Sequence, residues 1–346
     1  MHPAITALLA PRQPVGLPVW RSLWDALHAG TLRRGEAVAL LASLATSPPD
    51  ADTAEALLDS LNERRPPVRP VPGGCVNVVG TGGGPRTFNV STAAAFVAAA
   101  TGLPVVKTGA RTYSGGRGSF DLLELLGIPL ASGHDDVEEA LDRHGLAFAG
   151  YFVYPAELAL LARAVLPLQL REIGRFVNVL GPVLAAAPAT AQLTGVSDPG
   201  VLDLLRRLAA RRGGARVWFC TNDVGADELT GFADDVLHPA DGPPVRLADL
   251  GLPDVSGSLA DLRPPPPGTD PVADFHDVLA GRRGPVATHV VCLNAAAMRV
   301  VADPATRWPD ALAAAREAVA SGAASDLLTR MRAERSGRRR AVAAGG

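Results

Sequence analysis

Three features that mark whole classes of protein are scarce in this sequence: excess charge of one sign, paired cysteines and long apolar runs. The formal net charge of the 346 residues is −2. Proteins that neutralise the phosphates of nucleic acids usually carry a surplus of basic residues. The near-neutral balance therefore argues against a nucleic-acid partner.

The few cysteines show no pairing pattern. Cys75, Cys220 and Cys292 stand far apart, and none of them belongs to a CxxC motif. Zinc sites and redox motifs depend on such spacings. We therefore expect buried structural thiols in a reducing compartment.

Segments that would direct the chain to or across a membrane are also missing from the pattern. The N-terminus has no basic region followed by an apolar stretch and a cleavage site. The alanine-rich run at 93–100 is too short to span a bilayer and is bounded by Gly102 and Pro104. We expect a cytoplasmic protein with no membrane contact.

The chain begins with helical patterns. Trp20, Leu23, Trp24 and Leu27 recur at helical spacing, and two further helices are expected by residue 62. The proline- and glycine-rich segment ERRPPVRPVPGG that follows is typical of a domain crossing. A length of 346 residues allows two domains.

From Val76 onwards, short apolar runs alternate with helical patterns. This alternation predicts an α/β domain with a mostly parallel central sheet flanked by helices. The expected strands are 75–79, 104–107, 147–153, 216–220 and 286–291, and the expected helices are 90–101, 118–127, 135–143, 156–172, 198–212 and 308–321.

A glycine-rich loop, GTGGGPRTFNVST at 80–92, joins the first expected strand to an alanine-rich helix. Backbone N–H groups of Gly80, Gly82 and Gly83 can approach an anion, and the N-terminus of the helix adds partial positive charge. The alternative is a tight turn in which Asn89 or Ser91 caps the helix. The loop matches neither the P-loop nor the dinucleotide-binding GxGxxG pattern.

A second loop of this kind follows the next expected strand, in VVKTGARTYSGGRGSFDLLELLG at 105–127. Lys107 ends the strand, although it could also be a solvated charge. The loop after it is cationic and rich in hydrogen-bond donors. Ligands of open α/β sheets bind at the carboxyl ends of the strands. The two loops therefore predict a clamp for a ligand that carries two phosphate groups.

Two adjacent acids lie in a third loop, TNDVGADELTGF at 221–232. Asp227 and Glu228 alone would be a solvated surface pair. Beside two anion-binding loops, their oxygens suit Mg²⁺, which binds through one or two carboxylates and substrate phosphates.

These motifs, together with VNVLGP and CLNAAA, closely resemble those of anthranilate phosphoribosyltransferase, from about residue 20 to residue 330. The resemblance implies a homodimer, 5-phosphoribosyl 1-diphosphate as donor and Mg²⁺ on its diphosphate. It implies a helical domain at 1–68 joined by part of 155–182, an α/β donor-binding domain at 69–335 and a flexible tail at 336–346.

The resemblance also implies roles for individual residues. Lys107, Asp227 and Glu228 are the expected catalytic residues, and Ser91 joins the two acids as a metal ligand. The residues expected to bind the donor are Gly80, Thr81, Gly82, Gly83, Thr87, Asn89, Ser91, Thr92, Lys107, Arg111, Ser114, Gly115 and Ser119.

This chain departs from the family pattern mostly on the acceptor side. Gly84 and Pro85 replace the Asp-Gly of GTGGDG, and Thr108 and Ala110 replace the His and Asn of KHGN. Tyr154 replaces the His of HPA. The arginine that holds the anthranilate carboxylate does not align cleanly, which leaves Arg163 and Arg171 as candidates.

The donor and metal elements are mostly kept, although Ser114 and Gly115 stand where the family has a pair of serines, while the acceptor elements are mostly changed. The sequence therefore favours an Mg²⁺-dependent phosphoribosyltransferase with an aromatic or heteroaromatic acceptor other than anthranilate. Two alternatives stay open: a true anthranilate phosphoribosyltransferase of tryptophan biosynthesis, and a non-catalytic homologue that binds the donor. The residues name neither the acceptor, nor the atom that attacks, nor a general base.

Overall fold

The computed structural model describes residues 1–10, 13–65, 67–111, 118–253 and 255–344. Two of the expected donor-binding residues, Ser114 and Gly115, lie outside this part of the chain.

The first part of the chain is helical, as predicted. Trp20, Leu23, Trp24 and Leu27 form the buried face of α2, and the two tryptophan rings stack 6.0 Å apart. The Asp50 side chain accepts a hydrogen bond from the Thr53 N–H and so fixes the start of α4. The sequence missed the first of the four helices, which are α1 (Pro3–Leu9), α2 (Leu17–His28), α3 (Arg34–Thr46) and α4 (Ala51–Asn62).

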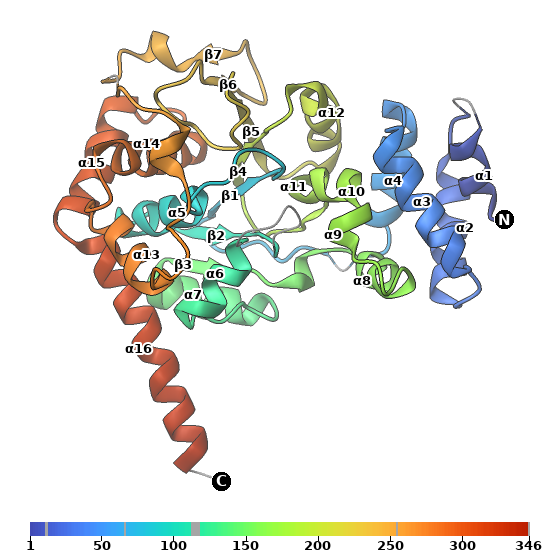
Figure 1. Ribbon diagram of the computed structural model, residues 1–346, viewed down its shortest axis with the longest axis horizontal. Coiled ribbons are helices and arrows are strands. Elements are labelled where there is room, and N and C mark those ends of the chain that lie inside the picture. Colours follow the sequence, from blue (N-terminus) through green and yellow to red (C-terminus); the bar gives the residue numbers. More distant parts are fainter. Residues whose placement is uncertain (11–12, 66, 112–117, 254, 345–346) are drawn as a thin grey trace.

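The second part is built on a seven-stranded sheet in the order β3-β2-β1-β4-β5-β6-β7 (Figure 1). The five strands from β3 to β5 are parallel, and β6 and β7 extend the sheet antiparallel. This confirms the expected α/β class with a mostly parallel sheet. The strands are β1 (Val76–Gly80), β2 (Val105–Lys107), β3 (Leu146–Phe148), β4 (Ala191–Gly195), β5 (Arg216–Thr221), β6 (Val236–His238) and β7 (Val245–Arg246).

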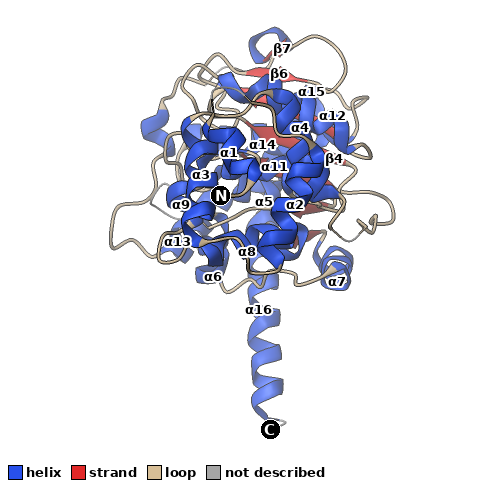
Figure 2. Cartoon of the chain, turned by 90° about the vertical axis from the view of Figure 1, so that its right-hand side faces the viewer, coloured by secondary structure: helices blue, strands red, loops and turns tan. Residues whose placement is uncertain are grey.

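Helices cover both faces of this sheet (Figures 1 and 2). One core contains α5 and α14 packed on the sheet, and α15 packs outside them. The helices of this part are α5 (Val90–Ala100), α6 (Ser119–Leu126), α7 (His134–His144), α8 (Ala156–Ala164), α9 (Leu170–Ile173), α10 (Arg175–Val179), α11 (Gly181–Leu184), α12 (Leu202–Arg212), α13 (Pro271–Leu279), α14 (Pro285–Ala302), α15 (Trp308–Ala320) and α16 (Ala323–Ala344).

The predicted strand at 286–291 is wrong, because this segment begins α14. Almost every side chain of α14 is buried, so the helix shows no polar face by which its period could be recognised. Short apolar runs of this kind do not distinguish a buried strand from a buried helix. Among the described helices, α14 alone has the length and apolar composition of a membrane span, and most of it is buried in the core.

Two further elements differ from the prediction. The helix expected at 156–172 is interrupted, because α8 ends at Ala164 and Pro167 cannot continue it. The strand expected at 147–153 ends at Phe148, and Tyr151–Val153 forms a 3-10 turn. The predicted thiols are confirmed: Cys75, Cys220 and Cys292 are free and buried.

A second core joins α1–α4 to α8, α10, α11 and α12. Residues 156–184 therefore return to the helical part after the chain has passed through three strands. Glu157 on α8 is buried, and its Oε1 atom lies 3.0 Å from the Nε2 atom of His28 on α2. The helical part thus forms one wall beside the sheet (Figure 2).

The strand order creates a crevice. From β1 the chain proceeds outward to β2 and β3, and then returns to add β4 and β5 on the other side of β1. Ligands of parallel α/β sheets bind outside the carboxyl ends of the strands at such a reversal. Here the reversal lies between β1 and β4.

Candidate active site

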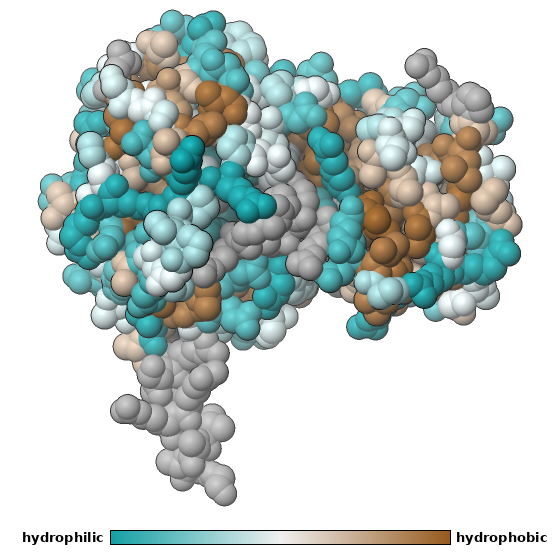
Figure 3. Space-filling view, in the orientation of Figure 1, coloured by the Kyte–Doolittle hydropathy of each residue, from teal (hydrophilic) through white to brown (hydrophobic). Residues whose placement is uncertain are grey.

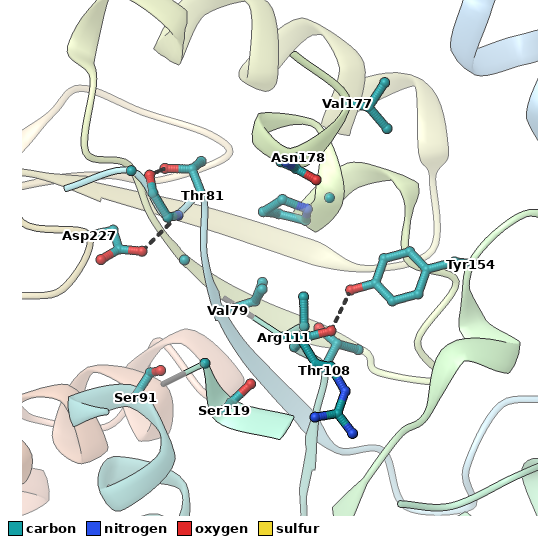
Figure 4. A pocket seen from close by; sticks show the side chains of 18 of the residues that line it. Val79, Thr81, Ser91, Thr108, Arg111, Ser119, Tyr154, Val177, Asn178 and Asp227 are labelled. Carbon is teal, nitrogen blue, oxygen red and sulfur yellow. Dashed lines mark hydrogen bonds between the residues drawn. The ribbon is translucent and has the colours of Figure 1, made fainter. Parts of the chain in front are cut away.

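A cavity of about 760 Å³ opens at this reversal. One side is made by the loops that follow β1, β2 and β5, and the other by α8, α10 and α11. In Figure 4, Asp227 and Thr81 lie on one side, Tyr154, Asn178 and Val177 on the opposite side, and Ser91 and Ser119 below. The cavity therefore combines a polar, glycine-rich side with a largely apolar side.

The glycine loop is fitted around Asp227. The N–H of Gly82 donates to the Oδ2 atom of Asp227 at 2.8 Å. A Cβ on Gly80 would lie 2.0 Å from the same Oδ2 atom, and a Cβ on Gly195 would lie 1.6 Å from the backbone oxygen of Asp227. Both positions therefore require glycine so that the acid can enter between β1 and β4.

The packing of the glycine loop explains why it has no acid at position 84. Gly84, which stands where the family keeps aspartate, packs against the loop that carries Asp227. A Cβ at this position would lie 2.4 Å from the backbone oxygen of Gly225. An aspartate could not enter this loop without moving one of the two segments.

The polar residues after the glycines lie at the start of α5. Asn89 has a left-handed backbone conformation (φ 67°) and occupies the N-cap position. It lines the cavity together with Thr87 and Ser91. Thr92 is fully buried and lies outside the lining, and its Oγ1 atom has no partner among the described residues.

Lys107, the only lysine in the sequence, crosses the floor of the cavity. It is 3% exposed, and its Nζ atom donates to the carbonyl of Val78 at 3.1 Å and to the Oγ atom of Ser91 at 3.2 Å. Burial lowers the pKa of the Lys107 ammonium to about 8, although the charges of Asp227 and Glu228 act against this shift. A buried amine between neutral partners is ready to receive an anion.

Glu228 lies beside Asp227 with one oxygen unsatisfied. The Oε1 atom is buried, and no group in the described part of the chain bonds to it. Burial, and next the neighbouring charge of Asp227, raise the pKa of the Glu228 carboxyl well above its usual range. Two adjacent carboxyl groups, one with an orphaned oxygen, fit a divalent cation.

Two buried asparagines hold the loop that carries these acids. Asn222 bonds to the N–H of Ala226 and to the carbonyls of Ala226 and Glu228. Asn294 on α14 bonds to both the N–H and the carbonyl of Leu229. The loop is therefore fixed by hydrogen bonds from two different elements.

Two of the predicted acceptor residues, Thr108 and Tyr154, lie on the cavity wall and are already hydrogen-bonded. Tyr154 donates its hydroxyl to the carbonyl of Gly109 at 3.1 Å, and the backbone and side chain of Thr108 bond to Asn77. Ala110 contributes only a methyl group. Arg163 lines the cavity, whereas the side chain of Arg171 is outside the described part of the structure.

Arg111, predicted to bind the donor, lines the cavity but pairs with acids of α6. Its guanidinium lies 2.7 Å from Asp121 and 2.6 Å from Glu124. The remaining predicted donor residues that line the cavity are Gly80, Thr81, Gly82, Gly83, Thr87, Asn89, Ser91, Lys107 and Ser119.

Sequence reasoning missed several polar residues of this region. Asn77 interrupts the apolar run CVNVVG, and Gln192 lies in ATAQLTG, which was not recognised as a strand. A polar residue inside an apolar strand was the signal that could have identified Asn77. Asn178 and Pro182 lie within the motif VNVLGP, which was the signal available for them, whereas Ser197 carried none.

Comparisons with known proteins agree with this geometry. Residues 73–325 match the glycosyl transferase family, a/b domain. The chain is 35% identical to the anthranilate phosphoribosyltransferase of Moorella thermoacetica over 89% of its own length and 90% of the relative's. It is 33% identical to that of Methylobacterium nodulans over 90% and 92%.

Solved structures give the same result. The anthranilate phosphoribosyltransferase of Thermus thermophilus superposes with a TM-score of 0.78 at 29% identity, over 97% of this chain and all of that one. The enzyme of Saccharomyces cerevisiae in complex with PRPP and Mg superposes with a TM-score of 0.76 at 20% identity, over 96% and 97%. The second likeness concerns the fold alone.

Proposed function

The chain belongs to the anthranilate phosphoribosyltransferase family and is a phosphoribosyltransferase, and we propose that it transfers the phosphoribosyl group of 5-phosphoribosyl 1-diphosphate to an aromatic amine of the anthranilate type. The bond from the anomeric carbon to the diphosphate oxygen breaks, and a bond to the amine nitrogen forms. The amine loses a proton and diphosphate leaves.

The arrangement of Gly82, Asp227 and Lys107 supports this proposal most directly. It places an open glycine loop, an acid and a buried amine around one side of the cavity. Backbone N–H groups and the Lys107 ammonium would bind the phosphate groups of the donor. The leaving diphosphate gains negative charge in the transition state, and these groups would stabilise it there.

Asp227 and Glu228 would hold Mg²⁺, with Ser91 as a further oxygen ligand. The orphaned Oε1 atom of Glu228 fits this role, although the described residues contain no cluster of three acids, histidines or cysteines. The metal would neutralise charge on the diphosphate. Asp227 already orients the Gly82 N–H, so it would also keep the glycine loop in place.

Anthranilate is the acceptor that the relatives support. Both relatives cited above carry its name, and each match covers about nine-tenths of this chain. This favours the alternative that the sequence left open over its first interpretation. Arg163 lines the cavity and would pair with the acceptor carboxylate. The apolar wall around Leu158, Ala162 and Val177 would hold the ring.

A second candidate is an aromatic acceptor other than anthranilate. This candidate is supported by hydrogen bonds that already occupy the polar groups on the acceptor side. The Thr108 side chain bonds to Asn77, and the Tyr154 hydroxyl donates to the carbonyl of Gly109. Fewer polar atoms are then available to an acceptor than the family's histidine and asparagine would supply.

A screen of aromatic amines and acids with the donor and Mg²⁺, read out as diphosphate release, tests both candidates. Anthranilate turnover with a kcat/KM above that of every other acceptor would establish the first. A better acceptor without activity on anthranilate would establish the second. Complementation of a tryptophan auxotroph separates them in cells. If calorimetry detects no binding of the donor with Mg²⁺, both candidates fail.

We also propose that the protein forms a homodimer and is located in the cytoplasm. Figure 3 shows apolar residues gathered on the helical part of the molecule, and Leu9 on α1 is 55% exposed. Light scattering after size exclusion should then give twice the chain mass of 35.7 kDa. A monomer at micromolar concentration would contradict the dimer.

A further inference from the structure

A chain of buried amides connects the two sides of the cavity. Asn77 lies in the middle of β1 and is 0% exposed. Its Nδ2 atom donates to the Oε1 atom of Gln192 on β4 at 3.0 Å. The Nε2 atom of Gln192 donates in turn to the carbonyl of Pro182 at 3.1 Å and to the Oγ1 atom of Thr194 at 2.9 Å.

One end of this chain fixes the end of β2, where Lys107 lies on the donor side and Thr108 on the acceptor side. The Oδ1 atom of Asn77 accepts the N–H of Thr108 at 2.9 Å, and Asn77 also bonds to the Thr108 hydroxyl. The carbonyl of Thr108 lies 3.4 Å from the Nζ atom of Lys107. Asn77 therefore fixes the backbone of Thr108, and with it the position of the adjacent Lys107.

The other end reaches the acceptor side. Pro182 lies in α11 (Gly181–Leu184), and both Gly181 and Pro182 line the cavity. The hydrogen bond from Gln192 connects this helix to the floor of the sheet. These hydrogen bonds connect the two sides of the cavity without requiring that Asn77, Gln192 or Pro182 contact the donor diphosphate.

We propose that Asn77 is a positioning residue, which aligns Lys107 on the donor side with Thr108 and the Pro182 wall on the acceptor side. The inference builds on the proposed transfer reaction and adds how its two substrates are brought into line. A displacement at the anomeric carbon needs the nucleophile and the leaving group aligned, and small misplacements slow such reactions strongly. The glycine loop, the Lys107 ammonium and the two acids all remain when Asn77 is replaced, so donor affinity should be affected little.

Two variants of similar side-chain branching test the proposal. Asn77→Leu removes every hydrogen bond of the side chain, whereas Asn77→Asp keeps an oxygen for the Thr108 N–H. We expect Asn77→Leu to lower kcat by about ten- to a hundred-fold, with the KM for the donor changed by less than about three-fold. Asn77→Asp should recover a large part of kcat, because Thr108 stays in place.

The far end of the amide chain has a different expected signature. Gln192→Met keeps the volume but removes the bond to Pro182. We expect a higher KM for the acceptor, by about three- to ten-fold, with donor binding unchanged. Ser60→Ala is the matched control, because it removes a buried hydrogen bond to Trp24 in the helical part and should leave all kinetic constants unchanged.

A measurement without turnover keeps this inference separate from the proposed function. Hydrogen exchange of the Thr108 amide, followed by mass spectrometry of the peptide 105–111, should accelerate in Asn77→Leu and remain slow in Asn77→Asp. Unchanged exchange in Asn77→Leu overturns the inference, even if the wild-type protein transfers to no acceptor. With an active wild type, a kcat of Asn77→Leu within two-fold of its value, or a loss confined to donor KM, overturns it equally.

Discussion

Folding and function make opposite demands on Lys107. Burial of its ammonium destabilises the folded protein, whereas binding of a phosphorylated donor would use that charge. The Lys107 ammonium is buried on a floor of carbonyl and hydroxyl groups, and of the two nearby acids Glu228 is also buried, while Asp227 is partly exposed. A buried ammonium group has a lowered pKa unless a ligand of opposite charge compensates it. A phosphorylated donor would be that ligand.

The titration of Lys107 can be measured directly, because the chain has no other lysine. We expect a single resonance from ¹³C-labelled lysine to titrate near pH 8 in the free protein. Donor binding in the absence of metal should weaken as the pH rises through 8, because the ammonium form disappears. A titration near the ordinary value of 10.5 would contradict the described burial.

Replacing Lys107 by an uncharged residue should give a variant that is more stable than the wild type but inactive. A lysine whose folded pKa is lowered destabilises the folded state below that pKa, and the effect disappears as the pH rises towards the unfolded value. Replacing Lys107 by Met should therefore raise the unfolding free energy at pH 7, by up to about 3 kcal/mol.

Chemical denaturation at pH 7 and at pH 10 measures this difference, which should shrink at the higher pH. Calorimetry should show that the variant has lost donor binding. A destabilised Lys107→Met protein at pH 7 would show that the amine is satisfied without a ligand.

At the scale of elements, the site depends on how closely β1, β4 and the loop after β5 approach one another. Gly80 and Gly195 lie at the ends of two neighbouring strands, and Asp227 fills the space that their missing side chains leave. The acid thus reaches the crevice from a third strand, β5.

Gly195→Ala tests this approach. Its Cβ would overlap the Asp227 backbone, so we expect the loop to move away and the Gly82–Asp227 hydrogen bond to break. Overpacking of this kind costs about 1–3 kcal/mol, and the affinity for the donor with Mg²⁺ should fall by at least about ten-fold.

Gly35→Ala in α3 is the control, because its Cβ would meet no atom within 4 Å. It should raise stability by about 0.5–1 kcal/mol and leave donor affinity unchanged. Calorimetry and denaturation measure both variants. Normal donor affinity in Gly195→Ala would show that the position of Asp227 is not required.

At the scale of the whole molecule, the cavity joins two cores. Its polar side belongs to the sheet and its apolar side to α8, α10 and α11, which pack in the core that contains α1–α4. Donor and acceptor together should therefore stabilise both parts at once.

Thermal unfolding with the donor, Mg²⁺ and acceptor tests this coupling. Ligand at a hundred times its Kd should add about 2.7 kcal/mol to the unfolding free energy, and we expect one transition to move as a unit. Adding the acceptor should shift it further than the donor does alone. Two transitions, of which only one moves, would show that the helical part does not take part in binding.

Predicting the fold from the sequence succeeded where the patterns are local. The face of α2 and the glycine-loop start of α5 could be read from their residues. The segments that were missed have uninformative patterns: α14 is apolar on every side, and β4 carries Gln192 and Thr194. The prediction of domain boundaries, including a tail at 336–346, stays a prediction, although α16 continues to Ala344 and projects from the molecule (Figure 1).

By itself, the sequence determined which residues are candidates for binding the donor, because a glycine loop, Lys107 and the Asp227–Glu228 pair are contiguous motifs whose chemistry depends on residue type. Only the tertiary structure decided how the acceptor side is built. Thr108, Tyr154 and Pro182 are far apart in the chain, and their hydrogen-bond partners Asn77, Gly109 and Gln192 come from other elements. Which polar atoms remain available to an acceptor is a property of these contacts, and residue type alone does not fix it.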